Sequence, residues 1–313
     1  MFTGWVLPAL AAVFCWGVSD LFFKVSSRSD DHESHLKISV WFGVWMSILI
    51  PIGLPLSESG AGLSAIIAAH PFIFGVSLVY AVALMLTNVG LRHLDLSVQS
   101  PVENASAAVP PVFFLIWFLA KGKVRSIWEI ATVWDFVGTA VIVAGIVALT
   151  FAERGTRSGV RNRLGPIALV FPLLLTLGDG LETIVGGLAL DETGGGVGEI
   201  DFILMNSVAF VLVGVGCWLR LYVRKRRVYN LFARGEWPKC GAGGFEIAAY
   251  FCYVYALGIN PTFVAPVTSG YCLVTIVLSR LILKERPGMY RYLCLSAVFA
   301  GIVILSVSEA LKP

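Results

Sequence analysis

The sequence Ala-Gly-Ile-Val-Ala-Leu at residues 144–149 recurs as Ala-Gly-Ile-Val-Ile-Leu at residues 300–305, a constant offset of 156 residues. Each copy leads to a glutamate, Glu153 in the first and Glu309 in the second. Upstream, the Pro-Val pair at 101–102 corresponds to the pair at 266–267 at an offset of 165, so the second copy is about nine residues shorter between the two markers. Length changes of this kind belong in loops. The chain therefore reads as a duplication of a unit about half its length.

The composition indicates that the protein resides in a lipid bilayer. Apolar residues make up 57% of the chain, charged residues make up 14%, and the mean hydropathy is +0.82. A membrane-spanning helix needs about 20 predominantly apolar residues. Short polar breaks divide the chain into candidate spans near residues 4–25, 37–54, 71–91, 97–119, 129–151, 166–190, 201–223, 241–259, 262–283 and 289–308. The prediction is an all-α integral membrane protein with ten transmembrane helices.

The number of spans in each copy has a topological consequence. We expect a first five-helix repeat at residues 1–153, a basic linker at 154–164 and a second five-helix repeat at 165–313. Because five is odd, the second repeat enters the membrane from the opposite side, which predicts two inverted repeats. Such pairs favour alternating access around a site near the middle of the membrane.

The distribution of positive charge predicts the orientation. Nineteen of the 23 lysines and arginines fall on one side of the predicted membrane, and Lys121, Lys123, Arg125 and Lys312 fall on the other. The positive-inside rule makes the nineteen-residue side cytoplasmic, so both termini and the loop around Gly194–Gly196 are expected outside.

Several stretches resemble the EamA repeat of the drug/metabolite transporter superfamily: residues 263–269, 274–286 and 301–303 in the second half, with Trp16-Gly17 and Pro101 in the first. The resemblance implies a secondary carrier, often an exporter, of a small metabolite or drug-like molecule, in the plasma membrane (the inner membrane of a bacterium). Where the second half has Glu285, the first half has Ala120, a departure from the acidic ending usual in the family. Family members usually keep both termini in the cytoplasm, which conflicts with the charge distribution. The resemblance names no substrate and leaves the oligomeric state open.

Two acids near the middle of the sixth span are the strongest candidates for a functional site. Asp179 and Glu182 are three residues apart and so share one helical face. An ionisable group at this depth costs about 2.5–3.5 kcal/mol on insertion scales, which favours a functional reason for its presence. We expect both side chains to face a cavity, and we hypothesise that they couple transport to H+. The alternative is a structural pair that hydrogen bonds or an inward-facing arginine satisfy.

Further candidates lie in the other spans. Asp20, in the first span, is the approximate repeat equivalent of Asp179, although an ion pair with Lys24 explains it equally well. Prolines precede Glu103 and Asn104 in the fourth span and Ser269 in the ninth. Carbonyls freed by proline are tolerated where they line a cavity, so these residues are candidate substrate contacts. An interfacial helix start is the alternative for Glu103.

The eighth span carries Glu246, Tyr250 and Tyr253 on one stripe. An acid beside tyrosine rings is suited to a cation, although such a stripe is more often helix packing.

The sequence favours a carrier over other classes of protein. Its four histidines lie at loops or helix ends without the motifs of a metal or nucleophile site, which argues against an enzyme, a metal and a cofactor. The basic run Arg224–Arg227 lies beside a membrane span and is expected to bind anionic lipid, not nucleic acid. The alternative class is a non-transporting receptor or lipid-binding membrane protein.

Overall fold

The structure is a computed structural model that describes residues 4–26, 33–90, 103, 105–153, 170–191, 196–233, 235–282 and 289–311. Helices account for all of the regular structure in these ranges. The long helices are α1 (Val6–Ser26), α2 (Ser34–Gly53), α4 (Pro71–Gly90), α6 (Val109–Ala120), α7 (Val133–Glu153), α8 (Val170–Leu190), α9 (Glu199–Lys225), α10 (Trp237–Ile259), α12 (Tyr271–Ile282) and α13 (Met289–Ala310). Shorter elements are α3 (Leu63–Ala69), α11 (Val264–Thr268), η1 (Leu54–Leu56), η2 (Ala105–Ala108) and η3 (Ile127–Glu129).

Seven segments of the described chain are long and apolar enough to cross a membrane: α1, α2 with η1, α4, α8, α9, α10, and α11 together with α12. Three further apolar helical stretches, Val109–Ala120, Val133–Gly145 and Tyr292–Leu305, are shorter. The predicted linker at 154–164 lies outside the described residues. The prediction of an all-α membrane protein is confirmed, whereas the count of ten spans and their inverted arrangement remain predictions.

Two of the predicted continuous spans are broken. The span expected at 97–119 contains the 3-10 turn η2, and α6 begins only at Val109. Pro110 and Pro111 explain this start, because proline lacks an N–H and is tolerated in the first helical turn but not in the interior.

The span expected at 262–283 is interrupted at Ser269-Gly270, between α11 and α12. Thr268 and Ser269 turn their hydroxyls back onto carbonyls of the preceding turn, at Val264 and Pro266, and so compete with the helical pattern. Gly270 allows close packing here, since a Cβ at this position would lie 2.4 Å from Cδ1 of Ile302.

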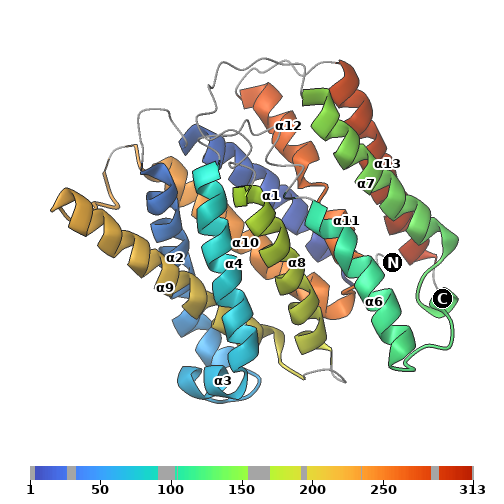
Figure 1. Ribbon diagram of the computed structural model, residues 1–313, viewed down its shortest axis with the longest axis horizontal. Helices are drawn as coiled ribbons and strands as arrows, with labels where there is room; N and C mark the ends of the chain where they lie inside the picture. The colour runs from blue at the N-terminus through green and yellow to red at the C-terminus, as the bar shows by residue number, and fades with distance from the viewer. Residues whose placement is uncertain are drawn as a thin grey trace.

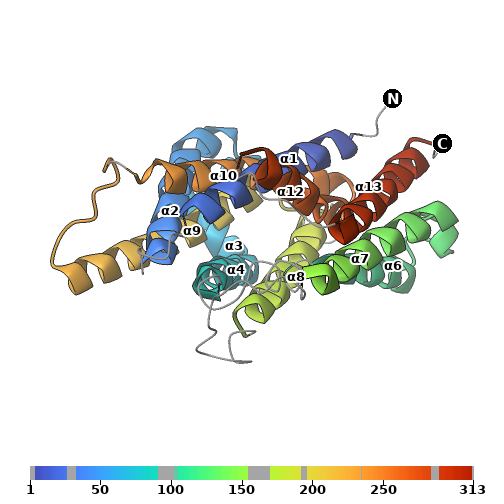
Figure 2. The ribbon, with the colours of Figure 1, turned by 90° about the horizontal axis from the view of Figure 1, so that it is seen from above.

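The helices pack side by side in four principal pairs: α1 with α10, α2 with α9, α4 with α8, and α7 with α13. Figures 1 and 2 show α7 and α13 at one end of the bundle and α2 and α9 toward the other. Both chain termini lie near the α7–α13 end. The helices that carry the candidate acids, α1, α8 and α10, therefore lie in the middle of the molecule.

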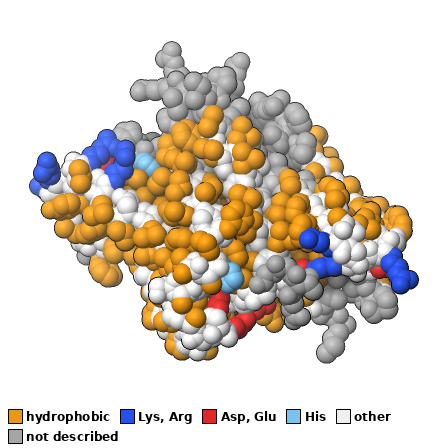
Figure 3. All heavy atoms as spheres, turned by 60° about the horizontal axis from the view of Figure 1, so that its bottom comes forward, with side chains coloured by type: hydrophobic (Ala, Val, Ile, Leu, Met, Phe, Trp, Pro, Cys, Tyr) orange, Lys and Arg blue, Asp and Glu red, His pale blue; other side chains and the backbone are white. Residues whose placement is uncertain are grey.

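Helix α8 shows how the sequence separates the interior from the lipid-facing surface. Leu173, Leu177 and Leu181 recur at helical spacing and are 49%, 70% and 41% exposed. The opposite face is buried and includes Gly178, Glu182 and Gly186. Exposed apolar side chains of this kind cover much of the face seen in Figure 3, with lysine and arginine toward its edges. This pattern is expected of a protein whose solvent is hydrocarbon.

Small residues let helices from the two predicted repeats approach closely. A Cβ on Gly214 of α9 would lie 2.9 Å from Cα of Gly43 on α2. A Cβ on Gly301 of α13 would lie 2.8 Å from the carbonyl oxygen of Gly138 on α7. In a bilayer, such backbone contact replaces the hydrophobic effect as a source of helix association.

Candidate functional site

A cavity of about 270 Å³ lies in the middle of the helix bundle. Helices α1, α4, α8, α10, α11 and α12 contribute to its walls, together with the residues just before α6. Its charged lining side chains are Asp20, Lys24, Glu103, Asp179 and Glu246. Its aromatic lining side chains are Trp16, Phe23, Tyr80, Tyr253 and Tyr271. Ligand sites in proteins typically combine apolar walls with a few placed polar groups, as this cavity does.

Of the two predicted acids of α8, only Asp179 lines the cavity. Ser106 donates a hydrogen bond to it, with 2.6 Å between Oγ and Oδ2. Glu182 is 3% exposed and is not among the lining residues; Tyr250 donates a hydrogen bond to its Oε1 at 3.0 Å. The expectation that both acids face the cavity is therefore wrong for Glu182. Three residues turn a helix by about 300°, so the two side chains point in directions about 60° apart. This difference is enough to direct Glu182 toward α10 instead of the cavity.

Asp20 lines the cavity from α1, as the repeat equivalence with Asp179 predicts. Thr275 of α12 donates a hydrogen bond to it, with 3.0 Å between Oγ1 and Oδ2. Lys24 also lines the cavity and lies within electrostatic range of Asp20. The ion-pair explanation and the functional explanation for Asp20 therefore both remain consistent with its surroundings.

Glu246 lines the cavity from α10 and is held by two donors from α1. The indole of Trp16 donates to Oε1 at 2.9 Å, and the hydroxyl of Ser19, which is shared between the Ala242 carbonyl oxygen at 2.9 Å and Oε2 at 3.1 Å, is the second donor. Tyr253 of the same stripe also lines the cavity, whereas Tyr250 is buried against Glu182. Both carboxylate oxygens of Glu246 are thus oriented by a neighbouring helix, which fixes the acid in position.

The candidates that follow the two prolines have different outcomes. Glu103 lines the cavity and accepts a hydrogen bond from Thr87 of α4. Ser269 also lines the cavity, and its hydroxyl donates to the carbonyl of Pro266 at 2.6 Å. Asn104 lies outside the described residues.

Several lining residues were not predicted from the sequence. Trp16 lies four positions before Asp20, so an aromatic and acidic stripe on α1 was available as a signal. Ser106 and Tyr271 had no such signal, because a single hydroxyl or aromatic residue in an apolar segment is common. Only the packing of distant helices brings them to the cavity.

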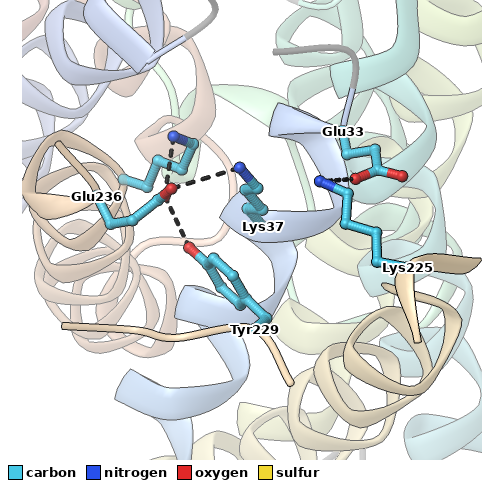
Figure 4. Close-up of polar contacts among 6 residues, drawn as sticks. Glu33, Lys37, Lys225, Tyr229 and Glu236 are labelled. Carbon is cyan, nitrogen blue, oxygen red and sulfur yellow. Dashed lines mark hydrogen bonds and ion pairs between the residues drawn. The ribbon is translucent and has the colours of Figure 1, made fainter. Parts of the chain in front are cut away.

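The basic side of the bundle carries an ionic network around Glu236, which immediately precedes α10 (Figure 4). Lys239 contacts its Oε2 at 2.9 Å, Tyr229 donates to the same oxygen at 2.8 Å, and Lys37 of α2 contacts Oε1 at 3.4 Å. Burial would raise the pKa of Glu236, but Lys239, Tyr229 and Lys37 together lower it below its ordinary value.

A second ionic contact lies nearby, between the start of α2 and the end of α9 (Figure 4). Glu33 is buried, and Lys225 contacts its Oε2 at 2.5 Å while Arg224 contacts Oε1 at 3.4 Å. The two contacts tie together the ends of α2, α9 and α10 on the side where positive charge accumulates.

The opposite end of the bundle carries an acidic layer. Ser57 and the backbone N–H of Ser59 both donate to Asp201 of α9, which closes the loop after η1 onto that helix. Burial and the neighbouring acids Glu199 and Asp201 raise the pKa of Glu58 in the same loop. In the described part of the chain, no three histidine, cysteine or acidic side chains gather to hold a metal ion.

Comparison with known proteins gives a match to a family model and matches to solved structures. Residues 187–307 match the model of the EamA-like transporter family, which confirms the resemblance seen in the sequence. A solved structure, recorded simply as the crystal structure of a protein, is 12% identical to the chain, covers 100% of both chains and has a TM-score of 0.63. At this identity the likeness concerns the fold alone. No curated protein matches the chain. The EamA match and the apolar helices together indicate a multi-pass membrane transporter for a small molecule.

Proposed function

Starting from the EamA match, we propose that this chain is a secondary carrier that exports a small metabolite or drug-like molecule across the plasma membrane by alternating access, coupled to protons. The observation that carries the proposal is the interior cavity of about 270 Å³ with four carboxyl groups in its wall. Acids are expensive in a membrane and persist mainly where they bind a substrate or relay protons. A position among the helices of both predicted repeats is the one expected for a transport site.

The pairing of the helices supports the alternating-access part of the proposal. If α1 corresponds to α8 and α4 to α10, as the predicted repeats require, then the α1–α10 pair becomes the α8–α4 pair when the halves are exchanged. Under the same exchange, α2 and α9 change places within their pair, and α7 and α13 change places within theirs. A bundle with this internal correspondence has two related arrangements of similar energy, in which the cavity opens to opposite sides.

The two ends of the bundle supply contacts that such a motion would break in turn. The Glu236 and Glu33 networks tie α2, α9 and α10 together at the basic end. The Asp201 contacts close the acidic end. We propose that the first set holds one side of the cavity closed and the second set the other.

The proton-coupling part of the proposal is carried by Asp179, with Glu182 one turn further along α8. Asp179 faces the cavity and accepts a hydrogen bond from Ser106, whereas Glu182 accepts one from Tyr250 behind it. The two acids therefore offer one proton site in contact with substrate and a second in the protein interior.

The test is flux in proteoliposomes that contain the purified protein and a mixture of metabolites, with and without a pH gradient. Gradient-dependent flux that Asp179→Asn abolishes is the expected result. If gradient-driven flux is unchanged in both Asp179→Asn and Glu182→Gln, coupling of transport to protons through these acids is wrong. Ligand binding without flux of any component would instead favour the non-transporting receptor.

A further inference from the structure

The loop that follows η1, residues 57–62, lies on the N-terminal end of α9 at the acidic end of the bundle. The Ser57 hydroxyl and the Ser59 backbone N–H both donate to Asp201 in the first turn of α9. Between these two contacts, Glu58 reaches Gly198, the residue that caps α9. Figure 3, which turns this end toward the reader, shows acidic side chains grouped on it. The loop belongs to the first predicted repeat and α9 to the second, so this contact joins the two.

Gly198 leaves room for the Glu58 carboxyl group. A Cβ at position 198 would overlap this carboxyl group, so no larger residue fits beneath it. The Glu58 carboxyl accepts a hydrogen bond from the backbone N–H of Glu199 and lies within hydrogen-bonding reach of the Glu199 carboxyl. Glu199 is in turn packed against the end of α10, where a Cβ on Gly258 would lie 3.0 Å from its Oε1. The two carboxyl groups are therefore held together by backbone on both sides.

Two carboxyl groups in contact form a hydrogen bond only when one of them carries a proton, because two carboxylates offer acceptors alone. The charged groups of the described chain that act on Glu58 are Glu199 and Asp201, both on α9 and both acidic. Partial burial and the neighbouring acids raise the pKa of Glu58 above its ordinary 4.5, and the backbone N–H of Glu199 offsets only part of this effect. Glu58 therefore binds a proton more readily when the loop lies on α9.

We propose that Glu58 and Glu199 form a proton-dependent latch that holds the loop after η1 against α9. With one proton shared between the two carboxyl groups, the loop is closed onto α9. When that proton is lost, the two carboxylates and Asp201 repel one another, and the loop loosens. The role of the latch in transport rests on the proposed carrier function, in which the contacts at this end close one side of the cavity.

The direction of the pH effect follows from the linkage between proton binding and closure. A carboxyl group whose pKa is higher in the closed state stabilises that state fully below its ordinary pKa, and this contribution is lost as the pH rises through the raised value. The loop is therefore expected to loosen with a midpoint above pH 4.5. The hydrogen bonds from Ser57 and Ser59 to Asp201 need no shared proton, so the loosened loop stays near α9.

The experiment measures the distance between two spin labels in the full-length protein, in a background without the six native cysteines. Gly62→Cys places one label at the end of the loop, where no atom lies within 4 Å of the new Cβ. Ile259→Cys places the other at the half-exposed end of α10. We expect a narrow distribution of distances at about pH 4 and a longer, broader one at about pH 8. The midpoint is expected above pH 4.5.

Two variants of the labelled protein test the carboxyl pair. Glu58→Gln and Glu199→Gln each replace one carboxyl group by an amide, which donates to the remaining carboxylate without a proton from solution. Both are expected to keep the short distance across the whole pH range. Glu129→Gln is the matched control, because Glu129 is an exposed acid in a different loop, and it is expected to keep the pH dependence of the parent protein. Gel filtration identifies any variant that fails to fold.

The outcomes separate the latch from the carrier function. A distance that stays constant or shortens as the pH rises in the parent protein would overturn the latch, and this result does not depend on the folding of either Gln variant. A pH dependence that persists in both Glu58→Gln and Glu199→Gln would overturn its assignment to this carboxyl pair. A pH-dependent distance without flux of any compound in proteoliposomes would support the latch and overturn the carrier.

Discussion

Ser106 donates a hydrogen bond to Asp179 from the opposite half of the chain, with 2.6 Å between Oγ and Oδ2. A corresponding contact runs in the reverse direction, from Thr275 in the second half to Asp20 in the first, at 3.0 Å. In each case the acid belongs to the first long helix of one predicted repeat, and the hydroxyl belongs to the segment around the fourth predicted span of the other. The two contacts meet at one cavity, so each half orients the other's acid.

The first prediction concerns these hydroxyls. Ser106→Ala and Thr275→Ala are each expected to weaken binding of the transported molecule at least about tenfold, since a hydrogen bond to a charged group contributes about 1.5–3 kcal/mol. Ser77→Ala is the matched control, because Ser77 is also buried but donates to the carbonyl of Ile73 in its own helix. Calorimetric titration measures the three affinities. Equal losses of affinity in all three variants would show that the two contacts contribute no more to binding than ordinary packing does.

The contact between Tyr250 and Glu182 leads to a stability prediction. Glu182 is 3% exposed, and the Tyr250 hydroxyl donates to it at 3.0 Å. Tyr250→Phe removes this donor from a buried acid and is expected to lower the free energy of unfolding by about 1–3 kcal/mol. Tyr255→Phe, at a half-exposed position of the same helix, is expected to change it by less than about 0.5 kcal/mol. Unfolding in detergent measures both free energies. A loss for Tyr250→Phe no larger than that for Tyr255→Phe would contradict the assigned contact.

The positions of the acids could be predicted from the sequence because a carboxylate in an apolar segment is conspicuous. Asp20, Glu103, Asp179 and Glu246 were all identified in this way, and all four line the cavity. The direction of Glu182 could not be predicted, since residues three apart share only a broad helical face and a neighbouring tyrosine decides between core and cavity.

The helix boundaries could likewise be predicted only in part. Periodicity located the long apolar helices, but it could not reveal the breaks at η2 and at Ser269-Gly270. These breaks depend on local backbone chemistry: prolines that lack a donor and hydroxyls that bond to nearby carbonyls. The partners of the acids, such as Ser106, depend on contacts between residues far apart in the chain and carried no sequence signal.

The close approach of α2 and α9 leads to a third prediction. Gly214→Ala is expected to destabilise the protein, because the new Cβ would lie 2.9 Å from the Gly43 backbone, which cannot move aside as a side chain can. Gly216→Ala makes the same change two residues away, where no atom lies within 4 Å of the new Cβ. Alanine is about 1 kcal/mol better than glycine in a helix, so this control is expected to be neutral or stabilising. Equal melting temperatures for Gly214→Ala and Gly216→Ala would contradict the close packing of α2 against α9.

The ionic network around Glu236 predicts a pH-dependent stability. Its pKa is lowered below the ordinary 4.5, so the folded state binds the proton less readily than the unfolded chain does. The resulting stabilisation is present above pH 4.5 and is lost as the pH falls through the lowered pKa. Glu236→Gln is therefore expected to melt at a lower temperature than the wild type at neutral pH, with a difference that narrows below about pH 4.

The exposed acid Glu129 provides the control for this experiment, since Glu129→Gln removes a carboxylate outside the network. At neutral pH its melting temperature is expected to stay close to that of the wild type. A Glu236→Gln deficit that stays constant as the pH falls would show that the side chain contributes through packing and not through its charge.

The last prediction concerns orientation, on which the positive charge and the EamA resemblance disagree. The charge distribution places the loop that contains Trp128 outside and the loop that contains Phe232 in the cytoplasm. Both side chains are exposed, at 64% and 91%, so a cysteine at either position is open to reagent. In a background without the six native cysteines, Trp128→Cys is expected to react with a membrane-impermeant maleimide in intact cells. Phe232→Cys is expected to react only after permeabilisation. The reverse pattern would place both termini in the cytoplasm, as the EamA resemblance implies, and would show that the arginine-rich loops of this chain do not determine its topology.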